Sequence, residues 1–171
     1  MLDLGCGNGL ITKELAKKCK EVVGVDFSQP LLEVANRDHQ PANVIYLHMD
    51  ILNLDVMPQV ASGLFNKVLM YEVLQDIRKR DLITILRNIL RLSSEGCVIL
   101  FGSIPDRKRQ WKFYNTPKRR LMYLVRKISN REIIGTWWDK ELLEERVSRW
   151  ACNVNSMSRA KSYIRRIIEL M

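Results

Sequence analysis

The sequence of 171 residues lacks several features that mark large classes of proteins. It contains no run of 18 apolar residues, so we expect no membrane-spanning helix. Its four cysteines stand singly without a CxxC pair, and only two histidines accompany them, which argues against a structural zinc site and against a disulfide framework. No Lys or Arg precedes Lys13, unlike the basic start of a signal peptide. We therefore expect a cytoplasmic protein that binds no metal.

The sequence also has no internal repeat and no low-complexity linker. Its 47% of hydrophobic residues supply enough apolar material for a sizeable core, and its length suits one domain. We therefore expect a single domain over residues 1–171.

Charge is distributed unevenly along the chain. The net charge is +9, but residues 1–106 hold 11 Lys or Arg and 13 Asp or Glu, whereas residues 107–171 hold 17 and 6. The excess of positive charge therefore lies entirely in the C-terminal part. This asymmetry indicates an anionic partner, which could be nucleic acid, a membrane surface or a phosphorylated substrate.

Up to about residue 106, short apolar runs alternate with helical patterns, as in βαβ units. The expected strands are 1–4, 21–25, 43–47, 66–71 and 96–102, and the expected helices are 9–19, 29–38 and 80–92. The sequence therefore predicts an α/β fold, in which a doubly wound, mostly parallel sheet lies between two helical layers.

Residues 107–135 break this alternation. Trp111, Phe113 and Tyr114 stand among seven basic residues, and the following KRRLMYLVRKI has the pattern of a basic amphipathic helix. We expect this segment to be an insert that serves as a lid or a docking surface.

The C-terminal part is less regular. The pattern of 138–150 predicts a helix with Leu142, Leu143 and Val147 inward. In SYIRRIIELM, the spacing of Ile164, Ile167, Ile168 and Met171 favours a helix, whereas the β-branched composition suits a strand.

The clearest functional signal is LDLGCGNG at residues 2–9, an apolar strand that leads into a glycine turn and a helix. Glycines at 5, 7 and 9 allow a sharp turn and a close approach of a ligand to the backbone. Asp26 ends the second strand, where the doubly wound order brings its carboxylate beside the first turn, suited to accept both hydroxyl protons of a ribose. The glycines do not fit the dinucleotide fingerprint GxGxxG, and no GK[ST] of a P-loop follows.

With Asp3 ahead of the glycines, this run resembles motif I of the class I S-adenosylmethionine-dependent methyltransferases, which have a Rossmann-like fold. Four further segments resemble the same family in order, over about residues 2–106: VVGVDFS, LHMDILNL, FNKVLMYEVLQDI and GCVILFGSIPD. The resemblance implies that the cofactor is S-adenosyl-L-methionine.

The resemblance also assigns the site residues. The implied cofactor-binding residues are Asp3, Gly5, Cys6, Gly7, Gly9, Asp26, Phe27, Asp50, Ile51 and Met70, and the implied catalytic residues are Asp76 and Tyr71. Asp3 would fix the ammonium group of the cofactor or stabilise the turn, and Asp50 would bind the adenine or cap a helix. Met70 and Tyr71 would line the methyl path or belong to the core, and Asp76 would be a general base or a solvated acid.

The sequence departs from the family pattern at both ends. The family ordinarily has a helical segment before the first strand, and this sequence begins at that strand, so we expect impaired activity. Members finish with two further strands, the last antiparallel; CNVNSM and SYIRRIIEL match these poorly, and helical spacing argues against them.

The leading hypothesis is therefore methyl transfer to a small-molecule or biosynthetic-intermediate acceptor, for which the basic insert suggests an anionic acceptor. A nucleic-acid methyltransferase is the first alternative, because aromatic rings among basic residues suit stacked bases. The second is a non-catalytic cofactor-binding module whose basic helix docks on an anionic membrane or a partner protein.

Overall fold

The computed structural model describes residues 1–56, 65–129, 134–156 and 166–170. The strands are β1 (Leu2–Leu4), β2 (Val22–Asp26), β3 (Val44–His48), β4 (Phe65–Tyr71), β5 (Ser93–Gly102) and β6 (Arg166–Leu170). The α-helices are α1 (Leu10–Ala16), α2 (Gln29–Asp38), α3 (Leu82–Leu92), α4 (Gln110–Phe113), α5 (Pro117–Ile128) and α6 (Lys140–Ser156). Three 3₁₀ turns are η1 (Ile51–Val56), η2 (Leu74–Asp76) and η3 (Arg107–Arg109).

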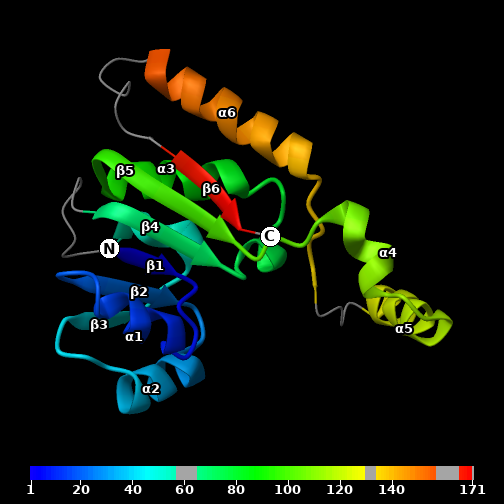
Figure 1. Cartoon of the computed structure of the whole chain (residues 1–171), viewed down its shortest axis with the longest axis horizontal. Helices are drawn as coiled ribbons and strands as arrows, with labels where there is room; N and C mark the ends of the chain where they lie inside the picture. Colours follow the sequence, from blue (N-terminus) through cyan, green and yellow to red (C-terminus); the bar gives the residue numbers. More distant parts are fainter. Residues whose placement is uncertain (57–64, 130–133, 157–165, 171) are drawn as a thin grey trace.

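The six strands form one sheet in the order β3-β2-β1-β4-β5-β6, and every pair is parallel. The register aligns Leu2 of β1 with Val23 of β2 on one side and with Val68 of β4 on the other. Figure 1 shows α1 in front of the sheet at β2 and β3, and α3 behind β4 and β5. The predicted doubly wound, parallel sheet between helical layers is confirmed.

The pleat of β1 explains how the two faces of the sheet differ. Leu2 and Leu4 are fully buried in the main core cluster, which also holds the buried face of α3 and residues Leu143 and Val147 of α6. Asp3 points to the opposite face, as alternation along a strand requires. A smaller cluster around Ala16 of α1 covers that face.

The N-terminal elements formed as predicted, and the helix expected over 138–150 is α6, with Leu143 and Val147 buried. Leu142 was expected to point inward but is 43% exposed, because adjacent residues of a helix do not share a face. The segments after residue 150 differ from the prediction. The stretch CNVNSM was expected to make a poor strand, but residues 152–156 belong to α6. Residues 166–170, whose spacing favoured a helix, form β6, which is parallel to β5 rather than antiparallel. The edge of β5 explains why this segment is extended, because the unpaired backbone N–H and C=O groups of β5 bond to those of residues 166–170. Ile164 and Met171 lie outside the described residues.

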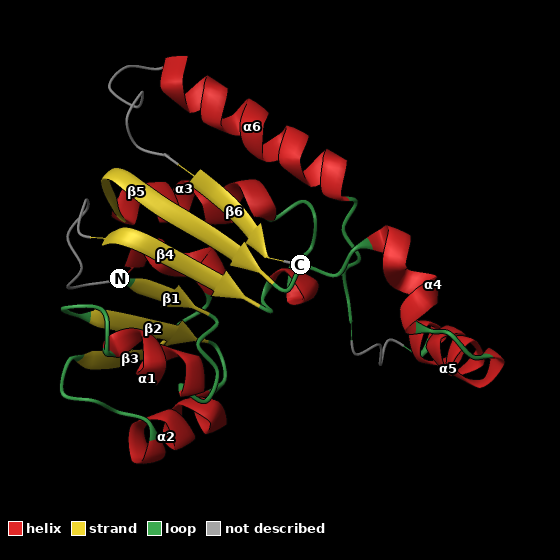
Figure 2. Cartoon of the chain, viewed as in Figure 1, coloured by secondary structure: helices red, strands yellow, loops and turns green. Residues whose placement is uncertain are grey.

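The predicted insert forms η3, α4 and α5, which extend beyond the end of the sheet (Figure 2). Residues 134–139 return from the insert and bond to the loops that follow β4 and β5. The indole of Trp138, 2% exposed, donates to the carbonyl of Leu74 at 2.7 Å, and its amide donates to the carbonyl of Pro105 at 2.8 Å. No helix in the described part of the chain is long and apolar enough to cross a membrane.

Candidate functional site

A cavity of about 680 Å³, here called the main cavity, opens at the carboxyl ends of β1, β2, β3 and β4. Chain order reverses between β1 and β4, and ligands of open α/β sheets bind at such switch points. Nine of the twelve predicted site residues line it: Gly5, Cys6, Gly7, Asp26, Phe27, Asp50, Ile51, Tyr71 and Asp76.

The three glycines of the first turn adopt left-handed conformations, with φ of 75° at Gly5, 55° at Gly7 and 79° at Gly9. Packing also demands two of them, because a Cβ would collide with Val73 at Gly5 and with Tyr46 at Gly9. A Cβ at Gly7 would meet no atom within 4 Å. Gly7 therefore faces free space in the main cavity, and a side chain there would occupy room for a ligand.

Asp26 connects the ends of β1 and β2. Its Oδ2 accepts the Gly7 amide at 2.7 Å and its Oδ1 accepts the Ser28 amide at 2.8 Å. A carboxylate offers about four acceptor sites, so about two remain for a ligand. The side chain is buried yet lines the cavity, which suits an acceptor of ligand hydroxyls.

Asp50 and Ile51 follow β3. Asp50 Oδ1 accepts a hydrogen bond from the amide of Leu52 at 2.8 Å and so caps η1. Capping is one of the two roles expected for Asp50; the other is binding of the adenine. The buried side chain of Asn88 in α3 stabilises this turn, because its amide nitrogen donates to the carbonyl of Leu52 at 2.9 Å. Asn88 was not among the predicted site residues; its signal in the sequence is an amide on the apolar face of a helix.

Tyr71, Glu72 and Asp76 lie at the end of β4. Partial burial, and then the negative charge of Asp26, raise the pKa of Asp76. Glu72 has φ of 60°, rare for a residue with a side chain, and accepts a hydrogen bond from the Ser103 hydroxyl at 3.1 Å. Two carboxylates, those of Glu72 and Asp76, therefore line the cavity just after β4.

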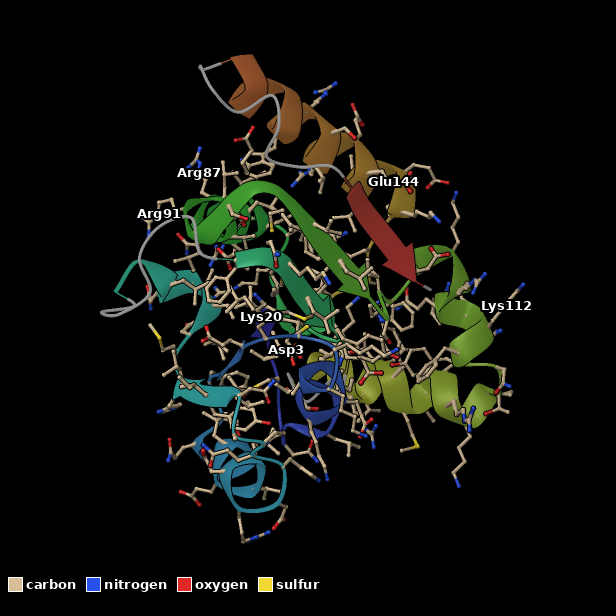
Figure 3. All side chains as sticks on the ribbon, turned by 60° about the vertical axis from the view of Figure 1, so that its left-hand side comes forward. Asp3, Lys20, Arg87, Arg91, Lys112 and Glu144 are labelled. Carbon is tan, nitrogen blue, oxygen red and sulfur yellow. The ribbon has the colours of Figure 1, made fainter. Side chains whose placement is uncertain are left out.

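Three predicted site residues lie outside the cavity lining. Asp3 is 3% exposed, and its Oδ2 accepts the Thr12 hydroxyl at 2.6 Å, so it fastens α1 to β1 beneath the turn. Gly9 packs against Tyr46, and Met70 is fully buried in the core because its side chain takes the inner face of β4. This placement supports the alternative roles given above, in which Asp3 stabilises the turn and Met70 belongs to the core. Figure 3 shows Asp3 among interior side chains, while Lys112 and Glu144 lie at the periphery.

Cys6 lines the cavity but is not poised as a nucleophile. Burial, followed by the charges of Asp3 and Asp26, raises the pKa of its thiol, so the thiol stays protonated at neutral pH. No group of three His, Cys, Asp or Glu side chains in the described ranges is arranged to hold a metal ion.

Several residues of the cavity wall were not predicted from the sequence. Leu10, Ile11 and Leu31 line it and are 55%, 41% and 43% exposed. Glu72 and Arg78 line it on the β4 side. Leu10 and Ile11 directly follow the glycine turn, and that position is a signal that could have identified them. The places of Leu31 in α2 and of Arg78 in a loop depend on how the chain folds.

The insert contributes nothing to the main cavity among its described residues. Its rings pack on one another and on Trp137, which follows the insert: the ring centroids of Tyr114 and Tyr123 lie 4.7 Å apart, and those of Phe113 and Trp137 lie 5.9 Å apart. The insert instead borders a second cavity, which shares Arg78 with the main one. The expected closure of a lid stays a prediction.

Comparison with known proteins agrees with this geometry. The profile of the family described as "Methyltransferase domain" matches residues 1–96. The chain is 31% identical over 116 residues to a ubiquinone biosynthesis O-methyltransferase of Coxiella burnetii, a match that covers 67% of this chain and 46% of the relative. It is 26% identical over 151 residues to the protein of that name from Methylococcus capsulatus, covering 88% and 60%.

The fold also matches a crystal structure of a S-adenosylmethionine-dependent methyltransferase from Archaeoglobus fulgidus with a TM-score of 0.61 and 18% identity, over 87% of this chain and 58% of that one. The chain spans about half the length of the curated relatives it matches. The family profile covers more than half of the chain and coincides with the glycine turn, Asp26 and the strands that carry them. The chain therefore belongs to the class I, Rossmann-like family of S-adenosylmethionine-dependent methyltransferases.

Proposed function

We propose that the protein transfers a methyl group from S-adenosylmethionine to an oxygen of a small-molecule acceptor. The observation that carries this proposal is the main cavity, which joins the Gly7–Asp26 side to the β4 end with Tyr71, Glu72 and Asp76 in one space of about 680 Å³. That volume suits a cofactor together with a small acceptor. The names of the two curated relatives support oxygen as the accepting atom.

The residues present fit the cofactor. Asp26 keeps acceptor capacity for two ribose hydroxyls after its bonds to Gly7 and Ser28. The free space above Gly7 gives room for the chain of the methionine portion. Asp50 and Ile51, together at the end of β3, suit an adenine amino group and ring.

When bound, the cofactor supplies a methyl group already activated by the positive sulfur. The protein must then orient the acceptor, exclude water and remove its proton. Asp76 suits this last task, because a raised pKa makes a carboxylate a stronger base. Apolar side chains at the rim, such as Leu10 and Ile11, suit the exclusion of water.

The alternatives have less support. A nucleic-acid methyltransferase would present ring faces to bases, but Trp111 meets Tyr123 edge to face, and Arg120 lies 5.6 Å from the centroid of Trp111. A non-catalytic module would need no proton acceptor beside the cofactor site, whereas Glu72 and Asp76 both line the cavity.

One experiment tests the proposal in two steps. Calorimetry with S-adenosylmethionine and with its demethylated product should show binding of both. A screen of phenolic, carboxylic and phosphorylated acceptors with labelled donor should then give labelled product from at least one small molecule. Binding without any transfer, or transfer only to oligonucleotides, would contradict the proposal.

A further inference from the structure

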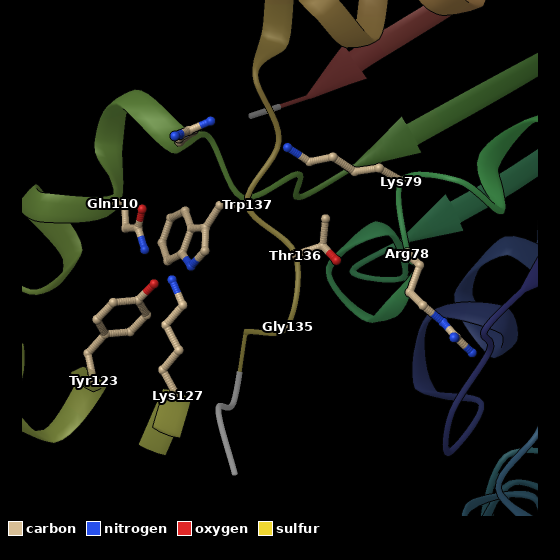
Figure 4. A pocket seen from close by; sticks show the side chains of 9 residues that line it. Arg78, Lys79, Gln110, Tyr123, Lys127, Gly135, Thr136 and Trp137 are labelled. Carbon is tan, nitrogen blue, oxygen red and sulfur yellow. The ribbon is translucent and has the colours of Figure 1, made fainter. Parts of the chain in front are cut away.

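A second cavity of about 390 Å³, here called the basic cavity, lies between η2 and the insert. Four of its lining residues carry positive charge, and none carries negative charge: Arg78, Lys79, Arg107 and Lys127. They come from two separate parts of the chain, the loop after η2 and the insert (Figure 4). Their like charges repel one another, so something must favour bringing them together.

Protein carboxylates neutralise little of this charge. Arg78 pairs with Asp81, with an Nε–Oδ2 distance of 3.4 Å. Lys79 lies 5.9 Å from the ring centroid of Trp138, and Lys127 lies 5.5 Å from that of Tyr123. Within the described residues, Lys79, Arg107 and Lys127 form no ion pair with a carboxylate.

A buried donor in the same cavity points independently to a ligand. Trp137 lines the cavity, and its indole nitrogen is buried without a hydrogen-bond partner in the described structure. Such a group is costly unless an acceptor satisfies it. Figure 4 shows the Lys127 ammonium and the Tyr123 hydroxyl directed to the same space as this nitrogen. The cavity therefore gathers donors and positive charge, and its lining contains no carboxylate.

A backbone hydrogen bond and a shared residue connect the walls of the basic cavity and the main cavity. The amide of Thr136, which lines it, donates to the carbonyl of Gln75 at 2.7 Å, and Gln75 lines the main cavity. Arg78 lines both cavities. A molecule held at its anionic end in the basic cavity would thus lie next to the space where the methyl acceptor belongs.

We propose that the basic cavity binds a phosphate group carried by the methyl acceptor. A dianionic phosphate matches three cations without carboxylate partners better than a single carboxylate does, and its oxygens satisfy several donors at once. The assignment to the acceptor rests on the proposed function, whereas the phosphate site does not. A phosphomonoester of a small molecule and a lipid head group share this chemistry, and the experiment separates them.

The test follows the indole N–H signals of the full chain by ¹⁵N NMR during titration with inorganic phosphate and with glycerol phosphate, at constant ionic strength. The Trp137 signal, assigned from Trp137→Phe, should shift and saturate. Lys127→Gln and Arg107→Gln should each weaken binding by about tenfold. Lys118→Gln is the matched control, because Lys118 lies on the same helix as Lys127 but does not line the cavity; it should change affinity little.

Absence of a Trp137 shift, or equal losses in Lys118→Gln and Lys127→Gln, would overturn the phosphate site. A shift caused only by vesicles of phosphatidic acid would assign the phosphate to a lipid head group and overturn the assignment to a small acceptor. Asp26→Ala should bind S-adenosylmethionine much more weakly and keep the phosphate-induced shift. Cofactor binding without phosphate binding would therefore reject this inference and leave the proposed function standing.

Discussion

The amide of Gly7 donates to Oδ2 of Asp26 at 2.7 Å, so the glycine turn after β1 and the acid that ends β2 form one unit. Gly7 contributes the free space above its Cα, and Asp26 contributes acceptors. Each residue keeps the other in place, because the bond joins segments 19 positions apart in the chain. Changes at these two positions should therefore affect the cofactor for different physical reasons.

Replacing Asp26 by Ala should weaken binding of S-adenosylmethionine by about 2 to 3 kcal/mol, or about 30- to 150-fold. The variant removes the acceptors for the ribose and also leaves the amides of Gly7 and Ser28 without their partner. Calorimetry measures the affinity. Glu33→Ala, which removes an exposed acid of α2 outside the cavity, is the control and should bind like the parent. Equal affinity of both variants would mean that Asp26 does not hold the ribose.

Gly7→Val and Gly9→Val should separate ligand room from packing. At Gly7 the new side chain enters free space that the cofactor needs, so cofactor binding should be lost while the far-ultraviolet circular dichroism stays nearly unchanged. The free energy of unfolding should fall by about 1–2 kcal/mol, because a residue with a side chain is strained in the left-handed conformation. At Gly9 the side chain collides with Tyr46 and Ala35, so the main effect should be a lower melting temperature. Retained binding in Gly7→Val would show that the turn serves only the fold.

Asp76→Asn should lower kcat by about 100-fold or more while leaving the affinity for the cofactor nearly unchanged. The carboxylate must be deprotonated to accept a proton, so activity of the parent should fall as pH drops through the pKa of Asp76. Because burial and Asp26 raise that pKa, the fall should occur at a higher pH than for an ordinary Asp. Steady-state kinetics across pH tests this prediction. A larger loss in Glu72→Gln than in Asp76→Asn would transfer the role of base to Glu72.

The fold from β1 to β5 was predictable because its signals are local. The helix expected over 29–38 matches α2 at both ends, and the strand expected over 21–25 lies within one residue of β2. Residues 166–170 were not predictable, because their isoleucine spacing fits both a helix and a strand. Pairing with β5, more than 60 positions away in the chain, decides between them.

The candidate site also has a part that was predictable from the sequence and a part that was not. Gly5, Gly7, Asp26 and Asp50 lie at or just after the ends of strands, and parallel topology brings these ends together. Their positions were therefore predictable from the sequence. The bond from Thr12 to Asp3 and the burial of the Trp137 indole depend on how α1 and the insert pack. No spacing in the sequence encodes either of them.

Asp3 offers a test of what a buried charge costs this fold. Burial raises its pKa from the ordinary 3.8 to about 6, although the Thr12 hydroxyl opposes the rise. Between these two values the folded state binds more protons than the unfolded state, so this residue makes the protein less stable as pH rises through the window. The pKa difference corresponds to about 3 kcal/mol at neutral pH.

Asp3→Asn keeps an acceptor for the Thr12 hydroxyl and removes the charge, so its advantage over the parent should depend on pH. Unfolding by urea should show nearly equal free energies for both proteins at about pH 4, and up to about 3 kcal/mol more for the variant at about pH 7. Glu33→Gln, a change at an exposed acid, should show no such trend. If the variant is less stable than the parent at both pH values, then a charge on Asp3 does not destabilise the fold. If it is more stable but binds S-adenosylmethionine more weakly, the charge acts on the cofactor from beneath the turn, and Asp3 has both of the roles expected from the sequence.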